Sequence, residues 1–220
     1  MKDQPLIVEY YTDVLCVWAW IAQRRIDEIN AQSGAEIVFQ HRYIDLFGDT
    51  VTRIQEQWAD KGLYDGFCDH VCSVAAPYSS APVNSNVWRK TRPSTSTNAH
   101  LVIKAVELAE GEQAAIRFAL SLRKAFFIDA QDIGNLEILF ELVKQQKFEF
   151  EPVNQAINNG QAIASLMADY RKGKLQGIKG SPSYVIDGGR QILYGNIGYR
   201  VLHANISELL KNPSDEASWC

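Results

Sequence analysis

The sequence predicts an α/β fold made of one small strand-and-helix unit that is split by a long helical segment. Three observations predict it. A strand–helix–strand pattern occupies residues 1–50, and a strand–strand–helix pattern occupies residues 175–220. Between them, residues 51–174 carry the three-and-four apolar spacing of helices and no strand-like alternation.

The N-terminal pattern opens with a short run of apolar and aromatic residues, Leu6–Tyr11, which has the composition of a buried strand. From Ala19 to Ile29, apolar residues recur every three or four positions with polar and charged residues between them, which predicts an amphipathic helix. Ser33-Gly34 ends this helix, and Glu36–Tyr43 is predicted to be a second strand.

The C-terminal pattern complements the first. Ser183–Ile186 and Gln191–Tyr194 are predicted strands, and the turn residues Asp187–Arg190 join them as a hairpin. A helix is predicted from Tyr199 to Leu210. A β-α-β unit followed by β-β-α is the element order of the thioredoxin fold, so residues 1–50 and 175–220 are predicted to form a thioredoxin-like domain.

The middle of the chain is predicted to be an α-helical insertion domain, residues 51–174. Residues 75–97 are rich in Ser, Pro, Asn and Thr and predict an irregular connection. Four longer stretches have helical apolar spacing: Leu101–Ala109, Ala114–Phe127, Leu136–Val143 and Ala162–Tyr170.

Composition narrows the function classes. Of the 220 residues, 46% are hydrophobic, which is enough for a sizeable core, and the net charge of −4 gives no general attraction to nucleic acid or to membrane phosphates. No apolar run is long enough to span a bilayer, and the residues before Leu6 have no signal-peptide pattern. We therefore expect a cytoplasmic protein whose four cysteines rest as thiols.

Cys16 is the first candidate for chemistry because it stands at the start of the first predicted helix. Unpaired backbone N–H groups and the positive end of the helix dipole favour a thiolate at such a position. This placement predicts a lowered pKa and a nucleophilic sulfur. The alternative is that Cys16 is a small buried apolar residue, as most free cysteines are.

The segment around Cys16 resembles a known active site. Its pattern, Asp-x-x-Cys-x-Trp-x-aromatic from Asp13 to Trp20, is similar to that of DsbA-like proteins, and to the FrnE-like branch in particular. That family's usual motif is Asp-x-x-Cys-Pro-Trp-Cys, so Val17 replaces the proline and Ala19 replaces the second cysteine. The segment also resembles kappa-class glutathione transferases and 2-hydroxychromene-2-carboxylate isomerases, which carry a serine where Cys16 stands.

The resemblance continues along the chain in Asn98–His100, Leu122–Phe127, Gly177–Tyr184 and Gly195-Asn196. It implies a cis Ser181-Pro182 bond that faces Cys16 and leaves the Ser181 backbone free to pair with a peptide or with glutathione. It also implies that His100 faces the cleft and that Asn196 contacts the γ-glutamyl end of glutathione. Ile197 departs from the pattern, because glutathione-binding relatives have an acidic residue there.

The predicted site therefore has one catalytic residue and a set of residues that bind substrate or glutathione. The catalytic residue is Cys16, and the binding residues are Trp18, His100, Ser181, Pro182 and Asn196. Trp18 would form an apolar wall, although core packing of the first helix explains it equally well. No metal is expected, because Cys68 and Cys72 share a helix face without a second cysteine pair. Cys220 is expected to be a loose terminal thiol.

The missing second cysteine limits the mechanism, because a Cys-x-x-Cys pair needs its second thiol to attack the mixed disulfide. We predict an oxidoreductase of DsbA-like type that uses Cys16 alone, with glutathione as cosubstrate or with another small thiol or disulfide. Resolution by Cys68 or Cys72 is a further route. The alternatives are a glutathione-dependent isomerase or transferase and a non-catalytic thioredoxin-fold binding module. The oligomeric state stays open.

Overall fold

The computed structural model describes residues 4–211 of the chain. Cys220, for which a terminal thiol is predicted, lies outside the described residues. Within that part of the chain, no helix combines the length and the apolar composition that crossing a membrane requires.

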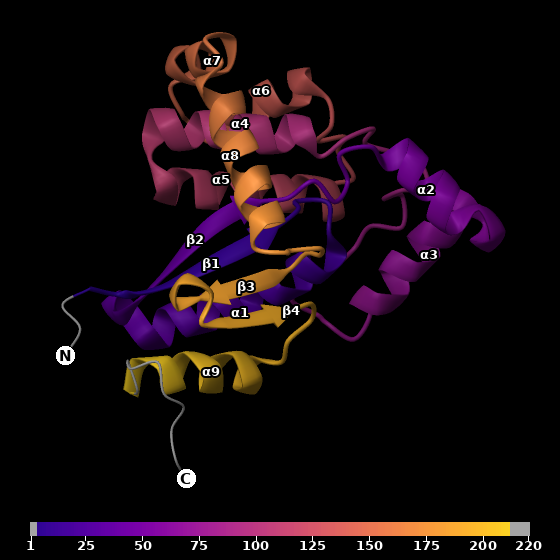
Figure 1. Ribbon diagram of the computed structural model, residues 1–220. Coiled ribbons are helices and arrows are strands. Elements are labelled where there is room, and N and C mark those ends of the chain that lie inside the picture. Colours follow the sequence, from indigo (N-terminus) through magenta and orange to yellow (C-terminus); the bar gives the residue numbers. More distant parts are fainter. Residues whose placement is uncertain (1–3, 212–220) are drawn as a thin grey trace.

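A four-stranded sheet forms the centre of the fold (Figure 1). Its strands are β1 (Leu6–Thr12), β2 (Ile37–Tyr43), β3 (Ser183–Ile186) and β4 (Gln191–Tyr194), in the order β2-β1-β3-β4. β1 runs parallel to β2 and antiparallel to β3, which pairs antiparallel with β4. This mixed sheet and the element order confirm the predicted thioredoxin fold.

Two helices cover one face of the sheet, α1 (Val17–Ser33) and α9 (Tyr199–Lys211) (Figure 1). Alternate residues of β1, such as Val8 and Tyr10, point to this face. They pack against apolar residues of the two helices, including Ile26 and Ile206. Both α1 and α9 therefore bury one apolar stripe against the sheet, as their amphipathic sequence patterns predict.

Seven α-helices lie between β2 and β3 in the chain. They are α2 (Thr50–Trp58), α3 (Leu63–Ala75), α4 (Thr97–Glu110), α5 (Glu112–Phe127), α6 (Leu136–Gln145), α7 (Phe150–Asn158) and α8 (Gln161–Leu175). The four predicted insertion helices are all present, and each extends beyond its predicted bounds. α2 and α7 are not predicted, because nine residues give too short a periodic pattern. The division into domains at residues 50 and 174 stays a prediction.

Asp169 of α8 fixes the inserted helices to the sheet. Its buried carboxylate lies 3.2 Å from the guanidinium of Arg42 on β2 and 3.3 Å from the ammonium of Lys104 on α4. Gly173 lets the same helix approach the sheet closely, since a Cβ there would lie 3.3 Å from the ring of Tyr11. α8 therefore holds the segment that follows it, which leads to Ser181, in a fixed place.

Candidate active site

Cys16 lies where the loop after β1 becomes α1. Cys16 is the N-cap residue of α1 and has an extended backbone conformation. Its main-chain N–H donates a hydrogen bond to the carbonyl oxygen of Asp13 at 3.1 Å. The thiol donates a hydrogen bond to the carbonyl oxygen of Ser181, 3.1 Å away. The Ser181-Pro182 bond is cis and lies against Cys16, as predicted.

Two details differ from the sequence-based expectation. The carbonyl of Ser181 is not free, because it accepts the proton of the thiol. The pKa of the Cys16 thiol is raised, so the predicted lowering is wrong for this structure. Burial is the main cause, since only 4% of the residue is exposed, and the negative charge of Asp13 adds to it. Hydrogen bonding with Ser181 and with the main-chain N–H groups of Trp18 and Ala19 lowers the pKa but does not cancel the effect of burial.

Asp13 organises the loop that carries Cys16. One carboxylate oxygen accepts from the main chain of Leu15 at 2.9 Å, and the other accepts from the main chain of Phe47 and the hydroxyl of Ser96, at 2.9 and 2.7 Å. The side chain is fully buried, so these bonds replace its hydration. The first residue of the family-like motif is therefore a structural anchor, and its main-chain N–H adds a bond to the Ser181 hydroxyl at 3.0 Å.

His100, which is predicted to face the cleft, has a fully buried side chain, and its contact with substrate stays a prediction. The imidazole is fully buried behind the loop, where Nε2 accepts from the main-chain N–H of Val14 at 3.2 Å and Nδ1 lies 3.5 Å from the hydroxyl of Tyr170. Burial lowers the pKa of His100 to about 4. The ring is therefore neutral at pH 7 and supports the loop from behind.

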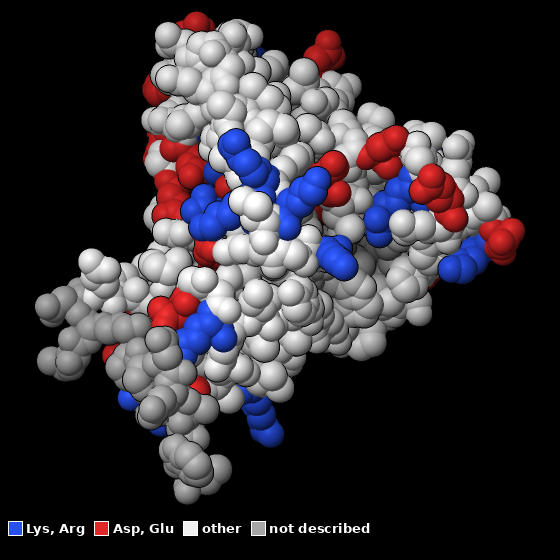
Figure 2. Space-filling model, viewed as in Figure 1, with Lys and Arg blue, Asp and Glu red and all other residues white. Residues whose placement is uncertain are grey.

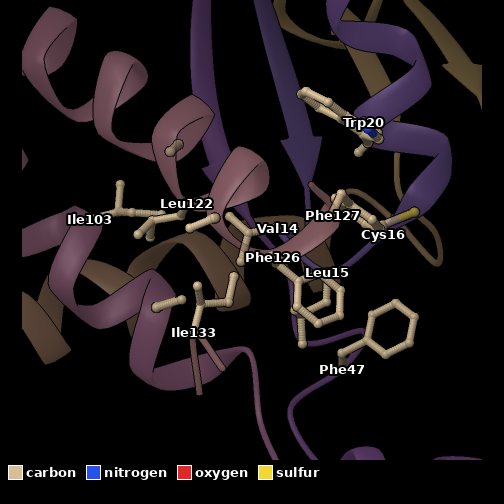
Figure 3. Close-up of a cluster of buried hydrophobic side chains, with 14 of the residues drawn as sticks. Val14, Leu15, Cys16, Trp20, Phe47, Ile103, Leu122, Phe126, Phe127 and Ile133 are labelled. Carbon is tan, nitrogen blue, oxygen red and sulfur yellow. The ribbon is translucent and has the colours of Figure 1, made fainter. Parts of the chain in front are cut away.

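The residues after Cys16 have different surroundings. Trp18 is half-buried, and Ala19 is fully buried. Because residue 19 is alanine, no thiol stands at the position of the family's usual second cysteine. Trp20 belongs to the core: its indole N–H donates to the carbonyl of Pro82, and its ring stacks on Phe127. Figure 3 shows Cys16 at the margin of this apolar cluster, beside Trp20 and Phe127. The role of Trp18 as an apolar wall stays a prediction.

The turn after β4 lies close to the cis-proline segment. The main-chain N–H of Gly195 donates to the carbonyl of Pro182 at 2.8 Å. The side chain of Asn196 is exposed but already engaged, because it accepts from Arg25 at 2.5 Å and donates to the hydroxyl of Tyr78 at 3.2 Å. Its contact with glutathione stays a prediction and would require exchange of these bonds.

The other two described cysteines belong to α3. Cys68 is buried in α3 and donates to the carbonyl of Ser85 at 3.4 Å, while Cys72 is half-buried one turn later. Burial raises the pKa of Cys68 to about 11, so it is a weak nucleophile at neutral pH. Among residues 4–211, no group of three or more His, Cys, Asp or Glu side chains is placed to hold a metal ion.

Sequence reasoning missed three polar residues of this region. Arg53 of α2 lies over the ring of Phe47, at 4.8 Å, close enough to Asp13 and Cys16 for its charge to interact with theirs when they are ionised. The other two are Ser96, which binds Asp13, and Arg123, which is fully buried and donates to Thr12 and Gln23. No local motif marks Arg53 or Ser96, which helix packing brings to the site. Arg123 lies in the family-like segment Leu122–Phe127, but the sequence predicts no role for it.

The sequence of this chain matches a known protein family and a curated relative. The family model described as "Thioredoxin" matches residues 10–191 of the chain. The ClpXP adapter protein SpxH of Halalkalibacterium halodurans is 25% identical over 190 residues, which cover 84% of this chain. The match spans only 59% of that relative's length.

Solved structures share the fold. A putative protein disulfide isomerase from Nitrosomonas europaea superimposes with a TM-score of 0.79 at 18% identity, covering 96% of this chain and 100% of the other. The cytosolic disulfide reductase DsbM of Pseudomonas aeruginosa with GSH superimposes with a TM-score of 0.64 at 16% sequence identity. The match covers 94% of this chain and 98% of DsbM. A 2-hydroxychromene-2-carboxylate isomerase superimposes with a TM-score of 0.63 at 14% sequence identity. The match covers 96% of this chain and 100% of the isomerase.

Proposed function

The chain belongs to the thioredoxin family whose model matches residues 10–191, and from that premise we propose that it is a DsbA-like thiol-disulfide oxidoreductase that works through Cys16 alone. One observation carries the proposal. The Cys16 sulfur lies 3.1 Å from the carbonyl oxygen of Ser181, beside the cis-proline, while position 19 holds a buried alanine. A sulfur stands at the helix N-terminus, and the next helical turn offers no thiol to resolve a mixed disulfide.

The proposed reaction has three exchanges. The Cys16 thiolate attacks one sulfur of a disulfide RS–SR, so that a Cys16–S–S–R bond forms and RS⁻ leaves with the electron pair. A glutathione thiolate then attacks the substrate sulfur, which releases the Cys16 thiolate and forms a glutathione–S–S–R disulfide. A second glutathione converts this to RSH and oxidised glutathione, so two glutathione molecules supply the two electrons.

Three features support glutathione as the cosubstrate. Arg53 places a positive charge near Cys16, which favours the thiolate and attracts a thiol that carries carboxylates. Gly195 holds the turn before α9 against Pro182, so Asn196 stands near the cis-proline segment. DsbM, which shares the fold, has been solved with GSH. A cycle driven by reduced glutathione belongs in a reducing compartment, so we place the protein in the cytoplasm.

The experiment is intact mass measured after incubation with oxidised glutathione. In a Cys220→Ala background, which removes the expected terminal thiol, we expect one glutathionyl adduct per chain, lost again on addition of reduced glutathione and absent when Cys16→Ser is added. A Cys68→Ala, Cys72→Ala double variant should form the same adduct. No adduct on Cys16 across pH 7 to 10, in protein that is folded by circular dichroism, would refute the proposal.

One observation favours a second candidate, a glutathione-dependent isomerase or transferase. The raised pKa keeps Cys16 protonated, and its thiol acts as a hydrogen-bond donor in the structure. A neutral donor could support the thiolate of bound glutathione, as the serine of the related enzymes does by resemblance. The Cys16→Ser variant separates the two candidates, because it should abolish the monothiol redox reaction but preserve the glutathione-dependent isomerase or transferase reaction.

A binding role without turnover is the third outcome. The curated relative is named as a ClpXP adapter, so a binding role has a concrete example among similar proteins. Absence of both the adduct and any glutathione-dependent reaction would favour that role here.

A further inference from the structure

A groove of about 550 Å³ opens beside the candidate active site. One wall is the segment after β2, which includes Ile44 and Leu46, and the other consists of Tyr170 and Lys174 of α8 and the turn that ends at Lys179. Both walls continue directly into the site. Leu46 precedes Phe47, whose N–H binds Asp13, and Lys179 lies two residues before Ser181.

The groove combines an apolar floor with positive charge. Ile44 belongs to a small apolar cluster with Tyr11 and Val185, against which Leu46 and Ile178 pack. Lys174 and Lys179 are exposed at the groove, and neither forms an ion pair with a carboxylate in the described part of the chain. The groove has a single carboxylate of its own, Asp45.

These two lysines differ from others near them. Lys172, on the same helix, is paired with Glu9, and Lys104 is paired with Asp169. Figure 2 shows Lys and Arg side chains gathered over the C-terminal half of α8 and the segment after it. The whole chain carries a net charge of −4, so this local excess of positive charge opposes the overall balance.

We propose that the groove binds an acidic segment of a polypeptide substrate, with an apolar side chain on its floor, and so presents that substrate's cysteine or disulfide to Cys16. Lys174 and Lys179 would pair with carboxylates of the segment. This proposal rests on the proposed function, because it names the class of protein substrate for the same sulfur.

The test compares two fluorescent peptides that differ only in two Glu-for-Gln changes beside a central Leu. In the binding arm, alanine replaces the peptide's cysteine, so that anisotropy measures affinity without thiol chemistry. We expect the acidic peptide to bind at least about fivefold more tightly than its amide counterpart, from two partly screened ion pairs, and the difference to shrink in salt.

Variants localise the effect. Lys174→Gln with Lys179→Gln should abolish the acidic-over-amide ratio. Arg171→Gln with Lys90→Gln is the matched control, because it removes the same charge from exposed residues that do not line the groove. An equal ratio for the two peptides, or an equal loss in the control pair, would overturn the proposal.

A reaction arm separates this proposal from the one on which it rests. The same peptides with cysteine, linked to thionitrobenzoate as a mixed disulfide, report attack by Cys16 as the part of the release of coloured thiol that is lost in Cys16→Ser. Charge-dependent binding without release would overturn the redox function and leave the groove as a peptide site. Release with no charge dependence would overturn the acidic-segment proposal and leave the redox function standing.

Discussion

The imidazole Nε2 of His100 accepts a hydrogen bond from the main-chain N–H of Val14, at 3.2 Å. This bond joins α4 of the inserted helices to the loop that carries Cys16. Because Nε2 is the acceptor, the ring proton must reside on Nδ1, which faces the hydroxyl of Tyr170. This hydrogen bond to the loop therefore exists only while His100 is neutral.

The first prediction is acid sensitivity that comes from His100. Burial, with a smaller contribution from the positive charge of Arg123, lowers its pKa from 6.5 to about 4, while Asp13 and Asp169 oppose the shift. Between these values the unfolded chain binds more protons than the folded protein. Stability from this group is therefore full above about pH 6.5 and falls by roughly 3 kcal/mol as the pH drops to 4.

The free energy of unfolding in urea, measured for wild type and His100→Gln from pH 4 to 7, checks this acid sensitivity. The glutamine keeps an acceptor for Val14 but cannot be protonated, so the variant should lose less stability on acidification. Buried His41, whose pKa is lowered to about 3, contributes a similar term in both proteins. Identical slopes for wild type and variant would contradict the assignment.

The second prediction concerns the charge of Asp13. Its carboxylate helps to raise the pKa of Cys16, so Asp13→Asn should lower that pKa and speed alkylation of Cys16 at pH 7 to 8. The same change weakens three hydrogen bonds and should cost about 1 to 3 kcal/mol of stability. Iodoacetamide rates against pH, read at the Cys16 peptide by mass spectrometry, measure the shift.

Ser96→Ala is the control for that experiment. It removes one hydrogen bond from Asp13 and leaves the carboxylate charged. If both variants speed alkylation equally, loosening of the loop rather than charge is the cause.

The third prediction is that Ala19→Cys restores a resolving thiol. The new sulfur would stand three residues after Cys16, one helical turn away, and would attack a mixed disulfide formed there. With oxidised glutathione the variant should end as an internal disulfide, with both halves of the glutathione released. Because Ala19 is fully buried, the larger side chain should cost about 1 to 3 kcal/mol.

Ala22→Cys matches it as a control, since Ala22 is also fully buried but lies a further turn along α1. That variant should retain the glutathionyl adduct on Cys16. Retention of the adduct in Ala19→Cys as well would show that the two sulfurs cannot meet.

The fourth prediction concerns Arg123, a fully buried cation that donates to the neutral groups of Thr12 and Gln23. Replacing it with methionine removes a buried charge, so the free energy of unfolding should stay within about 1 kcal/mol of wild type or increase. The pKa of His41 should rise, because the charge of Arg123 contributes to its lowering. NMR titration of the histidines measures this change.

Lys124→Met, at the exposed neighbouring position, should leave both quantities unchanged. A loss of more than about 3 kcal/mol in Arg123→Met would mean that the guanidinium has a compensating partner in the folded protein.

The sheet and the first helix were predictable because their apolar patterns are local. Ser183–Ile186 and Gln191–Tyr194 are strands over the predicted residues, since a turn separates two short apolar runs. The surroundings of Cys16 were not predictable from position alone. A helix N-terminus favours the thiolate, but burial outweighs it, and burial depends on helices far away in the chain. The same reason hid His100, whose helix packs behind the loop.

The hydrogen bond from Cys16 to Ser181 has a consequence for the lifetime of the thiol in the cell. Peroxides oxidise thiolates that reach solvent, and this sulfur is both protonated and covered at rest. An incoming peptide that donates its own N–H to the Ser181 carbonyl would displace the thiol proton from that acceptor. Loss of that acceptor would favour ionisation of the sulfur when a partner arrives, and without a partner the Cys16 thiol would stay protected from peroxides.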